Sequence, residues 1–242
     1  MALPLRVRGA RPSLTRWATL ARPNVLLAGV RPLSSGAGAT LSRLLDRELK
    51  LEREEEERNG GAVTPELMEL RDIVTQHMGI SEEAGSNLVT LKMDFDSAAG
   101  PEKVKVFFNV QEYTNEEDLI DEPVPEEEDS AGNIYPFEVR VARGGRVMRF
   151  YCQANAQQFT VENVVVSKGD DIDADFDEKD AYQYQGPSFD DLEPDLQTAF
   201  IEFLNERYVD DTLACFIASY ADYKEQQNYL QWLQDAEEFV KG

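Results

Sequence analysis

Residues 137–154 read F-E-V-R-V-A-R-G-G-R-V-M-R-F-Y-C-Q-A, and this segment indicates the class of the fold. Its two halves, residues 137–142 and 147–154, are rich in the β-branched and aromatic residues that strands favour. Between the halves, Gly144 and Gly145 supply the positive φ angles of a tight hairpin turn. The segment therefore predicts two antiparallel strands joined by a two-residue turn.

Similar patterns on both sides of this hairpin predict further strands. Residues 88–95 alternate weakly, residues 104–111 (V-K-V-F-F-N-V-Q) alternate strongly, and residues 159–167 are rich in valine. Residues 182–184 suggest a short last strand. Because these five or six strands follow one another without intervening helices, we expect one antiparallel sheet in an α+β protein.

Helical patterns stand at both ends of the chain. Thr40 is expected to cap a helix that ends at Asn59-Gly60-Gly61, and Thr64-Pro65 to begin a short second helix. Near the C-terminus, residues 192–204 form an amphipathic pattern with Pro194 in its first turn. Residues 209–212 are expected to end that helix and to cap a last one reaching about Val240.

The predicted first and last helices carry more apolar surface than one edge of a sheet covers. Such stripes indicate helix-on-helix packing, a subunit interface, or both. The residues expected to provide this packing are Leu41, Leu45, Leu49, Leu213, Ile217, Tyr220, Leu230 and Leu233.

The charge of the chain is strongly acidic and unevenly distributed. There are 24 basic and 47 acidic residues, a formal net charge of −23. Residues 1–40 contain six arginines and no acidic residue, so without them the net charge is six units more negative, −29. This charge repels nucleic-acid phosphates and attracts basic proteins, and salt weakens both effects. We therefore expect basic protein partners and no direct contact with nucleic acid.

The first forty residues have the composition of a mitochondrial transit peptide. They are rich in arginine, contain Ser and Thr, and lack acidic residues. Cleavage is expected near Ser34 or before Leu41, which leaves residues 41–242 as a single acidic domain. The alternative is a basic tail that binds RNA or lipid. The apolar runs are shorter than the ~18–20 residues of a spanning helix, so no membrane span is expected.

Two acidic segments, at 112–134 and 168–180, are expected to be mobile loops that bind the basic partners. Like charges extend such segments, which contain too few apolar residues to order themselves. The partner-binding residues predicted here are Glu116, Glu117, Asp118, Asp121, Glu122, Glu126, Glu127, Glu128, Asp129, Asp170, Asp171, Asp173, Asp175 and Asp177.

The residues that most often carry chemistry form no known catalytic or metal-binding pattern. His77 is the only histidine, so it has no histidine partner for a zinc site. The run Asp171-x-Asp173-x-Asp175 resembles the start of a calcium loop, but Phe176 and Tyr182 replace the required Gly and Glu. Cys152 and Cys215 form no C-x-x-C motif, and a buried structural thiol is expected at Cys152. We expect neither catalysis nor a cofactor.

Several segments together resemble the mitochondrial glycoprotein family of acidic matrix proteins. The similar segments are F-L-N-E-R-Y-V-D-D-T-L-A at 203–214, the helix after it ending in F-V-K, the strand pair F-E-V-R-V and V-M-R-F-Y-C, and L-D-R-E-L-K-L-E-R-E at 45–54. Residues 62–80 depart from the family, because their pattern is helical where its first strand is expected.

The resemblance implies a strongly twisted antiparallel sheet of about seven strands with one N-terminal and two C-terminal helices, assembled as a ring-shaped homotrimer. It also implies a matrix adaptor or chaperone that supports mitochondrial translation, ribosome assembly and oxidative phosphorylation. An accessory role in RNA processing, through a basic RNA-binding partner, is the alternative. An enzyme or a calcium sensor is the third hypothesis, which the missing motifs disfavour.

Overall fold

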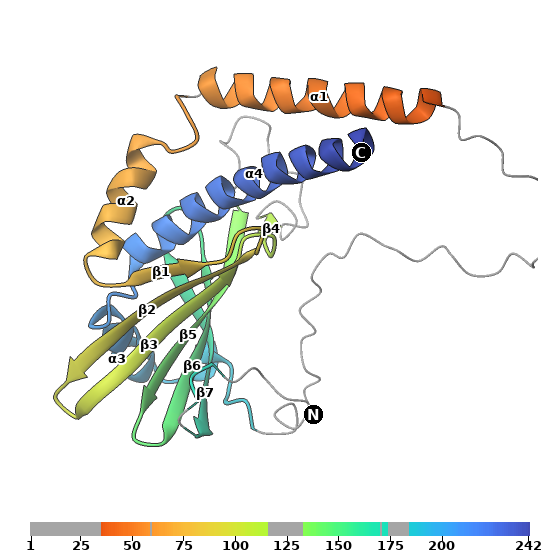
Figure 1. Cartoon of the computed structure of the whole chain (residues 1–242). Helices are drawn as coiled ribbons and strands as arrows, with labels where there is room; N and C mark the ends of the chain where they lie inside the picture. Colours follow the sequence, from red (N-terminus) through yellow and green to blue (C-terminus); the bar gives the residue numbers. More distant parts are fainter. Residues whose placement is uncertain (1–34, 59, 116–132, 170, 174–183) are drawn as a thin grey trace, which may run out of the picture.

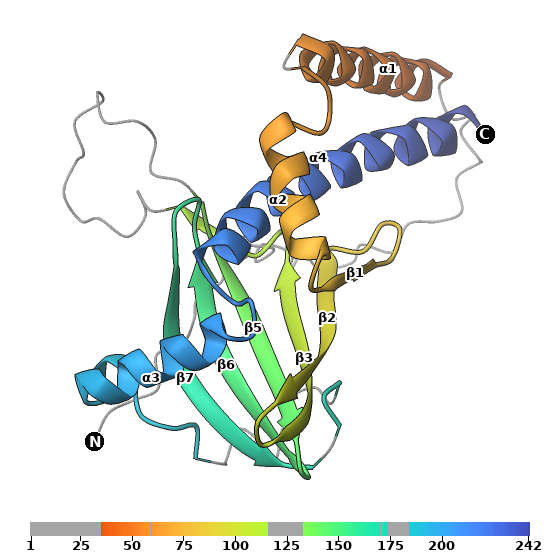
Figure 2. The ribbon, with the colours of Figure 1, turned by 90° about the vertical axis from the view of Figure 1, so that its left-hand side faces the viewer.

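The computed structural model describes residues 35–58, 60–115, 133–169, 171–173 and 184–242. An antiparallel sheet lies at its centre, and helices from both ends of the chain lie on one side of that sheet (Figures 1 and 2). The predicted α+β class with an antiparallel sheet is confirmed.

The strands of the main path follow the order of the chain, and every pairing is antiparallel. They are β1 (Gly79–Glu82), β2 (Leu88–Ser97), β3 (Gly100–Asn109), β5 (Asn133–Arg143), β6 (Arg146–Ala154) and β7 (Phe159–Lys168). The two-residue β4 (Thr114–Asn115) pairs with the beginning of β5, at Asn133 and Ile134. The views in Figures 1 and 2 show that the sheet is strongly twisted.

The hairpin predicted at residues 137–154 is confirmed. Arg143 pairs with Arg146, and the two residues between them, Gly144 and Gly145, have φ angles of 57° and 75°. Two positive φ angles in a row give the turn whose twist matches that of the flanking strands. The register of β5 and β6 follows from this turn.

Helix α1 (Ser35–Arg58) differs from the prediction at its beginning. It already includes Ser35, so Thr40 lies inside the helix and does not cap it. The Thr40 hydroxyl instead donates to the carbonyl oxygen of Gly36 at 2.8 Å, the bond that Thr makes within a helix. At the other end, Gly60 and Gly61 have positive φ angles and end the helix, as predicted.

Helix α2 (Pro65–Thr75) confirms the short helix expected after Thr64, whose hydroxyl accepts from the Leu67 N–H at 3.1 Å. The resemblance implied one N-terminal helix, and α2 is a second. The strand β1 that follows was not predicted, because its four residues, G-I-S-E, carry no alternating pattern. Pairing with β2 creates it. Tyr184 lies outside any strand, and residues 182–183 are outside the described part of the chain.

The C-terminal helices are confirmed as α3 (Pro194–Asn205) and α4 (Asp211–Lys241), and a 3-10 turn, η3 (Phe189–Asp191), precedes α3. Tyr208 has a φ of 58° and lies in the turn between α3 and α4. The Asp210 carboxylate then accepts from the Leu213 N–H at 3.0 Å and caps α4.

Apolar side chains form two separate clusters. The main core lies between the sheet and helices α2, α3 and α4, with Val106, Phe150 and Ile217 among its fully buried residues. The second cluster joins α1 to the second half of α4. Figure 1 shows these two helices side by side above one end of the sheet. Helix α4 therefore contributes to both clusters, with its first half in the main core and its second half in the cluster with α1.

Candidate functional site: the charged face of the sheet

The sheet has one face covered by the helices and a second face that carries charge. The pairing register places alternate side chains of each strand on this second face. They include Lys92 and Asp94 on β2, Lys103, Lys105 and Phe107 on β3, Glu138 and Arg140 on β5, and Arg149 and Tyr151 on β6.

Four cations lie opposite one another across four strands of the second face. Lys92 pairs with Lys105, Lys105 with Arg140, and Arg140 with Arg149; we call these four residues the basic row. Like charges in this arrangement destabilise a sheet. Glu138 offsets part of the repulsion, because its carboxylate accepts from Arg140 at 2.7 and 2.8 Å and from Arg149 at 3.3 Å.

A short acidic segment, residues 171–173, lies against the basic row. Lys105 forms an ion pair with the Asp173 carboxylate, and Arg140 donates to the Ile172 carbonyl oxygen at 3.0 Å. The Ile172 side chain is buried. The Asp171 carboxylate accepts from the Asp173 N–H at 3.0 Å, which closes a local turn. Both aspartates thus take part in contacts within the protein.

A groove of about 420 Å³ lies next to the basic row, towards β4. Its walls include apolar side chains such as Leu88, Ile134 and Pro136. Among the described residues that line it, the carboxylates are those of Glu112, Glu138 and Glu162, and none is a lysine or arginine. Burial raises the pKa of Glu162, although Gln153 donates to its carboxylate. The groove is therefore suited to a cationic side chain with an apolar neighbour.

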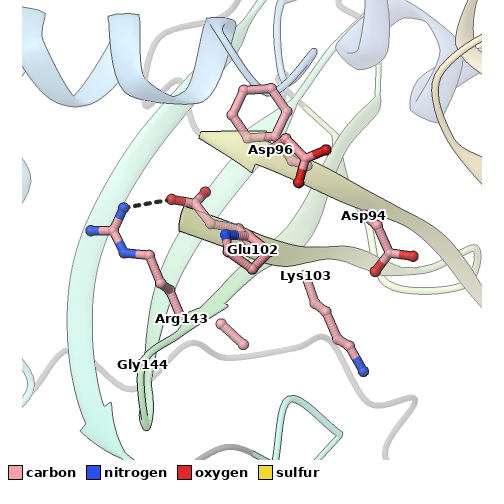
Figure 3. A pocket seen from close by; sticks show the side chains of 9 residues that line it. Asp94, Asp96, Glu102, Lys103, Arg143 and Gly144 are labelled. Atoms are coloured by element: carbon pink, nitrogen blue, oxygen red, sulfur yellow. Dashed lines mark hydrogen bonds and ion pairs between the residues drawn. The ribbon is translucent and has the colours of Figure 1, made fainter. Parts of the chain in front are cut away.

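At the opposite end of the sheet a buried ion-pair network joins the sheet to the turn after α3. Glu102, on the helix-covered face of β3, accepts from Arg207 at 2.8 and 3.2 Å and from Arg143 at 2.7 Å. Figure 3 shows the Arg143 contact beside a pocket of about 360 Å³. Burial by itself raises the pKa of Glu102, but the bonds from Arg207 and the positive charges outweigh it, so the pKa is lowered.

The Glu102 network was not predicted from the sequence, although a signal was present. Glu102 precedes Val104 and Val106 at the two-residue spacing of one strand face, so it had to share their buried face. A buried carboxylate requires a cation. Arg207 fills that role, and its guanidinium also lies 3.4 Å from the centre of the Phe203 ring. The charges of this network are paired with one another within the chain, so we assign it a structural role and not a role in partner binding.

A second acidic surface lies where α1 meets α4. Glu52 accepts from Gln226 and Glu56 from Gln227, each at 2.9 Å. Burial raises the pKa of Glu225, and the negative charges of Asp222 and Glu52 raise it further. Carboxylates are thus crowded here, and Glu54, Glu55 and Glu57 beside them are exposed. These glutamates were not among the partner-binding residues predicted from the sequence.

The structure describes two of the fourteen acidic residues predicted to bind partners, Asp171 and Asp173. The remaining twelve, at 116–129 and 170–177, lie outside the described residues. Asp173 remains well exposed despite its ion pair, with 65% of its side chain accessible.

The residues predicted for helix or subunit packing divide between the two clusters. Leu45, Leu49, Leu230 and Leu233 form the α1–α4 cluster, and Leu213, Ile217 and Tyr220 belong to the main core. Leu41 is exposed. Seven of these eight side chains are therefore buried within a single chain.

The histidine and the two cysteines have structural contacts. His77 stacks on Tyr208, with ring centres 3.6 Å apart. Burial raises the pKa of the Cys152 thiol, and it also raises that of Cys215, whose sulfur donates to the Ala156 carbonyl oxygen. A raised pKa makes a thiol a poor nucleophile at neutral pH.

The described residues show neither a membrane-spanning helix nor a cluster of metal ligands. None of the helices there has the length and apolarity to cross a membrane. Nor do three or more His, Cys, Asp or Glu side chains gather there in a group that could hold a metal ion.

Comparison with known sequences identifies relatives along most of the chain. Residues 45–240 match the family model described as Mitochondrial glycoprotein (MAM33). Mitochondrial acidic protein mam33 of Schizosaccharomyces pombe is 29% identical over 189 residues, which cover 67% of each protein. An uncharacterised mitochondrial protein of Arabidopsis thaliana is 25% identical over 164 residues, 67% of this chain but 61% of the relative. None of these descriptions specifies an enzymatic activity.

Solved structures share the fold. The Trypanosoma brucei p22 protein superimposes with a TM-score of 0.62 at 23% identity, covering 84% of this chain and 98% of its own. A Leishmania major protein of unknown function, described as a sequence homologue of human p32 protein, gives 0.61 at 19% identity, covering 85% and 99%. The family resemblance of the sequence is confirmed by the family match, and the chain belongs to the mitochondrial glycoprotein (MAM33) family of mitochondrial acidic proteins.

Proposed function

We propose that this protein is a non-enzymatic adaptor or chaperone of the mitochondrial matrix that binds basic proteins, such as ribosomal or RNA-binding proteins. Residues 1–40 would be its transit peptide, and residues 41–242 would act as a homotrimer. Many weak contacts repeated over three subunits would then give useful affinity.

The observation that carries this proposal is the acidic groove beside β4. The described residues that line it include no lysine or arginine, and of its three carboxylates Glu138 alone already accepts from arginines, Arg140 and Arg149. By contrast, Arg140, Arg149, Arg143, Arg207 and Lys105 each pair with a carboxylate of the protein itself. The carboxylates that remain exposed therefore dominate the field around the protein, which attracts cationic chains.

The proposal is tested by the binding of an arginine-rich peptide to the full chain, followed by fluorescence anisotropy at several salt concentrations. We expect binding that weakens steeply as salt rises. The double change Glu112→Gln and Glu162→Gln should weaken it more than Glu83→Gln with Glu206→Gln, which removes the same charge outside the groove. Binding that ignores salt, or equal effects of the two pairs, would contradict the proposal.

Within this role, support of mitochondrial translation, ribosome assembly and oxidative phosphorylation is the leading proposal. The alternative is RNA processing through a basic RNA-binding partner, because a net charge of −29 disfavours direct contact with RNA phosphates. Nuclease treatment of a captured complex separates the two. A complex that survives nuclease supports direct protein binding, and one that is lost supports the RNA-dependent role.

A further inference from the structure

The acidic residues expected to bind partners include two that already have a position on the sheet. Asp171 and Asp173 lie on either side of Ile172, whose side chain is 5% exposed. Three contacts hold this segment: the Lys105–Asp173 ion pair, the bond from Arg140 to the Ile172 carbonyl oxygen, and the burial of Ile172 itself.

The sheet can accommodate the basic row only if negative charge lies close to its four cations. Its four cations lie opposite one another, which costs stability in a sheet. Arg140 and Arg149 are buried and share the Glu138 carboxylate, whereas Lys105 keeps part of its side chain exposed and turns to Asp173. An acidic segment lying across the row relieves the repulsion.

We propose that the basic row is a docking site for an acidic segment, that residues 171–173 of the same chain occupy it, and that a basic partner competes with Lys105 for Asp173. The second half of this inference rests on the proposed function. Docking in this way keeps the exposed Asp173 carboxylate paired with Lys105 until a cationic chain displaces that lysine. Weakly basic proteins are thereby rejected, because they do not offset the loss of the internal ion pair.

The test compares Lys105→Gln with Lys103→Gln in the full chain. Both lysines lie on the second face of β3, two residues apart, so both changes alter the overall field of the protein by the same charge. Lys105 pairs with Asp173, whereas Lys103 lines the pocket of Figure 3. Circular dichroism establishes that each variant is folded.

Two measurements follow the docked segment and its competition. Amide exchange at Ile172 and Asp173 should become faster in Lys105→Gln and stay unchanged in Lys103→Gln. An arginine-rich peptide should bind Lys105→Gln about two- to fivefold more tightly than Lys103→Gln at low salt, the range expected for one partly exposed ion pair.

A third variant, Asp173→Asn, tests whether the effect of Lys105→Gln depends on the Lys105–Asp173 ion pair. In an Asp173→Asn background the internal ion pair is already absent, so Lys105→Gln and Lys103→Gln should then have equal effects on peptide affinity. Equal exchange at Ile172 and equal affinity in the two single variants would overturn the inference and leave the proposed function intact. If the wild-type protein does not bind the peptide at all, the proposed function fails, while amide exchange still reports whether the segment is docked.

Discussion

Among single residues, Arg207 is the one whose replacement should have the clearest effect on the stability of the fold. Its guanidinium pairs with Glu102 in a buried site between the sheet and the turn after α3. Removing Arg207 leaves the buried Glu102 carboxylate with the partly exposed Arg143 as its remaining arginine partner, so most of its charge compensation is lost. We expect Arg207→Met to lower the free energy of unfolding by about 3–5 kcal/mol, measured by urea titration. Arg143→Met, at the partly exposed partner, should cost much less, and an equal loss would contradict this account.

Two glutamates should give opposite pH dependence of stability. The folded-state pKa of Glu102 lies below its ordinary value of 4.5, so its stabilising contribution is present above that pH and is lost as the pH falls through the folded-state pKa. The pKa of Glu162 is raised, so its contribution is present at low pH and is lost as the pH rises through that pKa.

Urea midpoints at pH 7 and pH 4 test these signs. We expect Glu102→Gln to destabilise the protein at pH 7 and to reduce its acid sensitivity. Glu162→Gln should leave stability at pH 7 unchanged or higher, because it removes a half-buried charge while its amide oxygen can still accept from Gln153. A loss of stability at pH 7 on Glu162→Gln would show that the carboxylate has a stabilising partner.

At the scale of elements, α1 depends on a cluster separate from the main core. Leu45 and Leu49 of α1 contact the second half of α4 through Leu230 and Leu233. We expect Leu45→Ala to weaken the docking of α1 by about 2 kcal/mol or more. Amide exchange should then speed up along α1 and stay slow in β3 and β5. Leu44→Ala, at the exposed neighbour, is the control, and faster exchange in the sheet would refute the separation of the clusters.

Elements that are set by local pattern could be predicted, and those created by tertiary pairing could not. Gly144 and Gly145 determine a turn, and Asp210 caps α4, because the required chemistry lies within a few residues. The short strand β1 exists through its pairing with β2. The basic row has the same origin, since Lys92, Lys105, Arg140 and Arg149 come from four strands and meet only through the register.

The acidic groove likewise depends on the assembled sheet. Its carboxylates Glu112, Glu138 and Glu162 come from separate parts of the chain, so no single segment marks it. Partner binding could be predicted from the sequence only for the acidic runs, because the charge density of a segment is visible in its own residues. Burial, which raises the pKa of Glu162, is a property of the folded protein.

Considered as a whole molecule, the chain reverses its charge between a basic first segment and an acidic remainder. Residues 1–40 contain six arginines and no acidic residue. We expect them to be absent from the protein isolated from mitochondria, with a new N-terminus near Ser34 or Leu41, because this composition is typical of a transit peptide. N-terminal sequencing checks this, and intact Met1 in the matrix fraction would contradict it.

The helices also leave apolar surface uncovered. Leu41, Leu44 and Leu51 on α1 are about half exposed, as is Trp232 on α4, and Phe239 is 88% exposed. Large apolar patches are uncommon on soluble monomers and mark interaction surfaces. The family resemblance implies that three copies cover them. We therefore predict a trimeric mass for the wild-type protein in light scattering at micromolar concentration.

Variants at the exposed positions separate assembly from folding. Leu230 and Leu233 are buried against α1, so replacing them with Asp would loosen that helix as well as any interface. Trp232 and Phe239 belong to neither buried cluster, and we expect Trp232→Asp with Phe239→Asp to dissociate the trimer while circular dichroism stays unchanged. Tyr184→Asp adds charge at an exposed aromatic residue outside the helices and should leave the mass unchanged. A monomeric wild-type protein, or a trimer that survives the double change, would show that these side chains do not hold copies together.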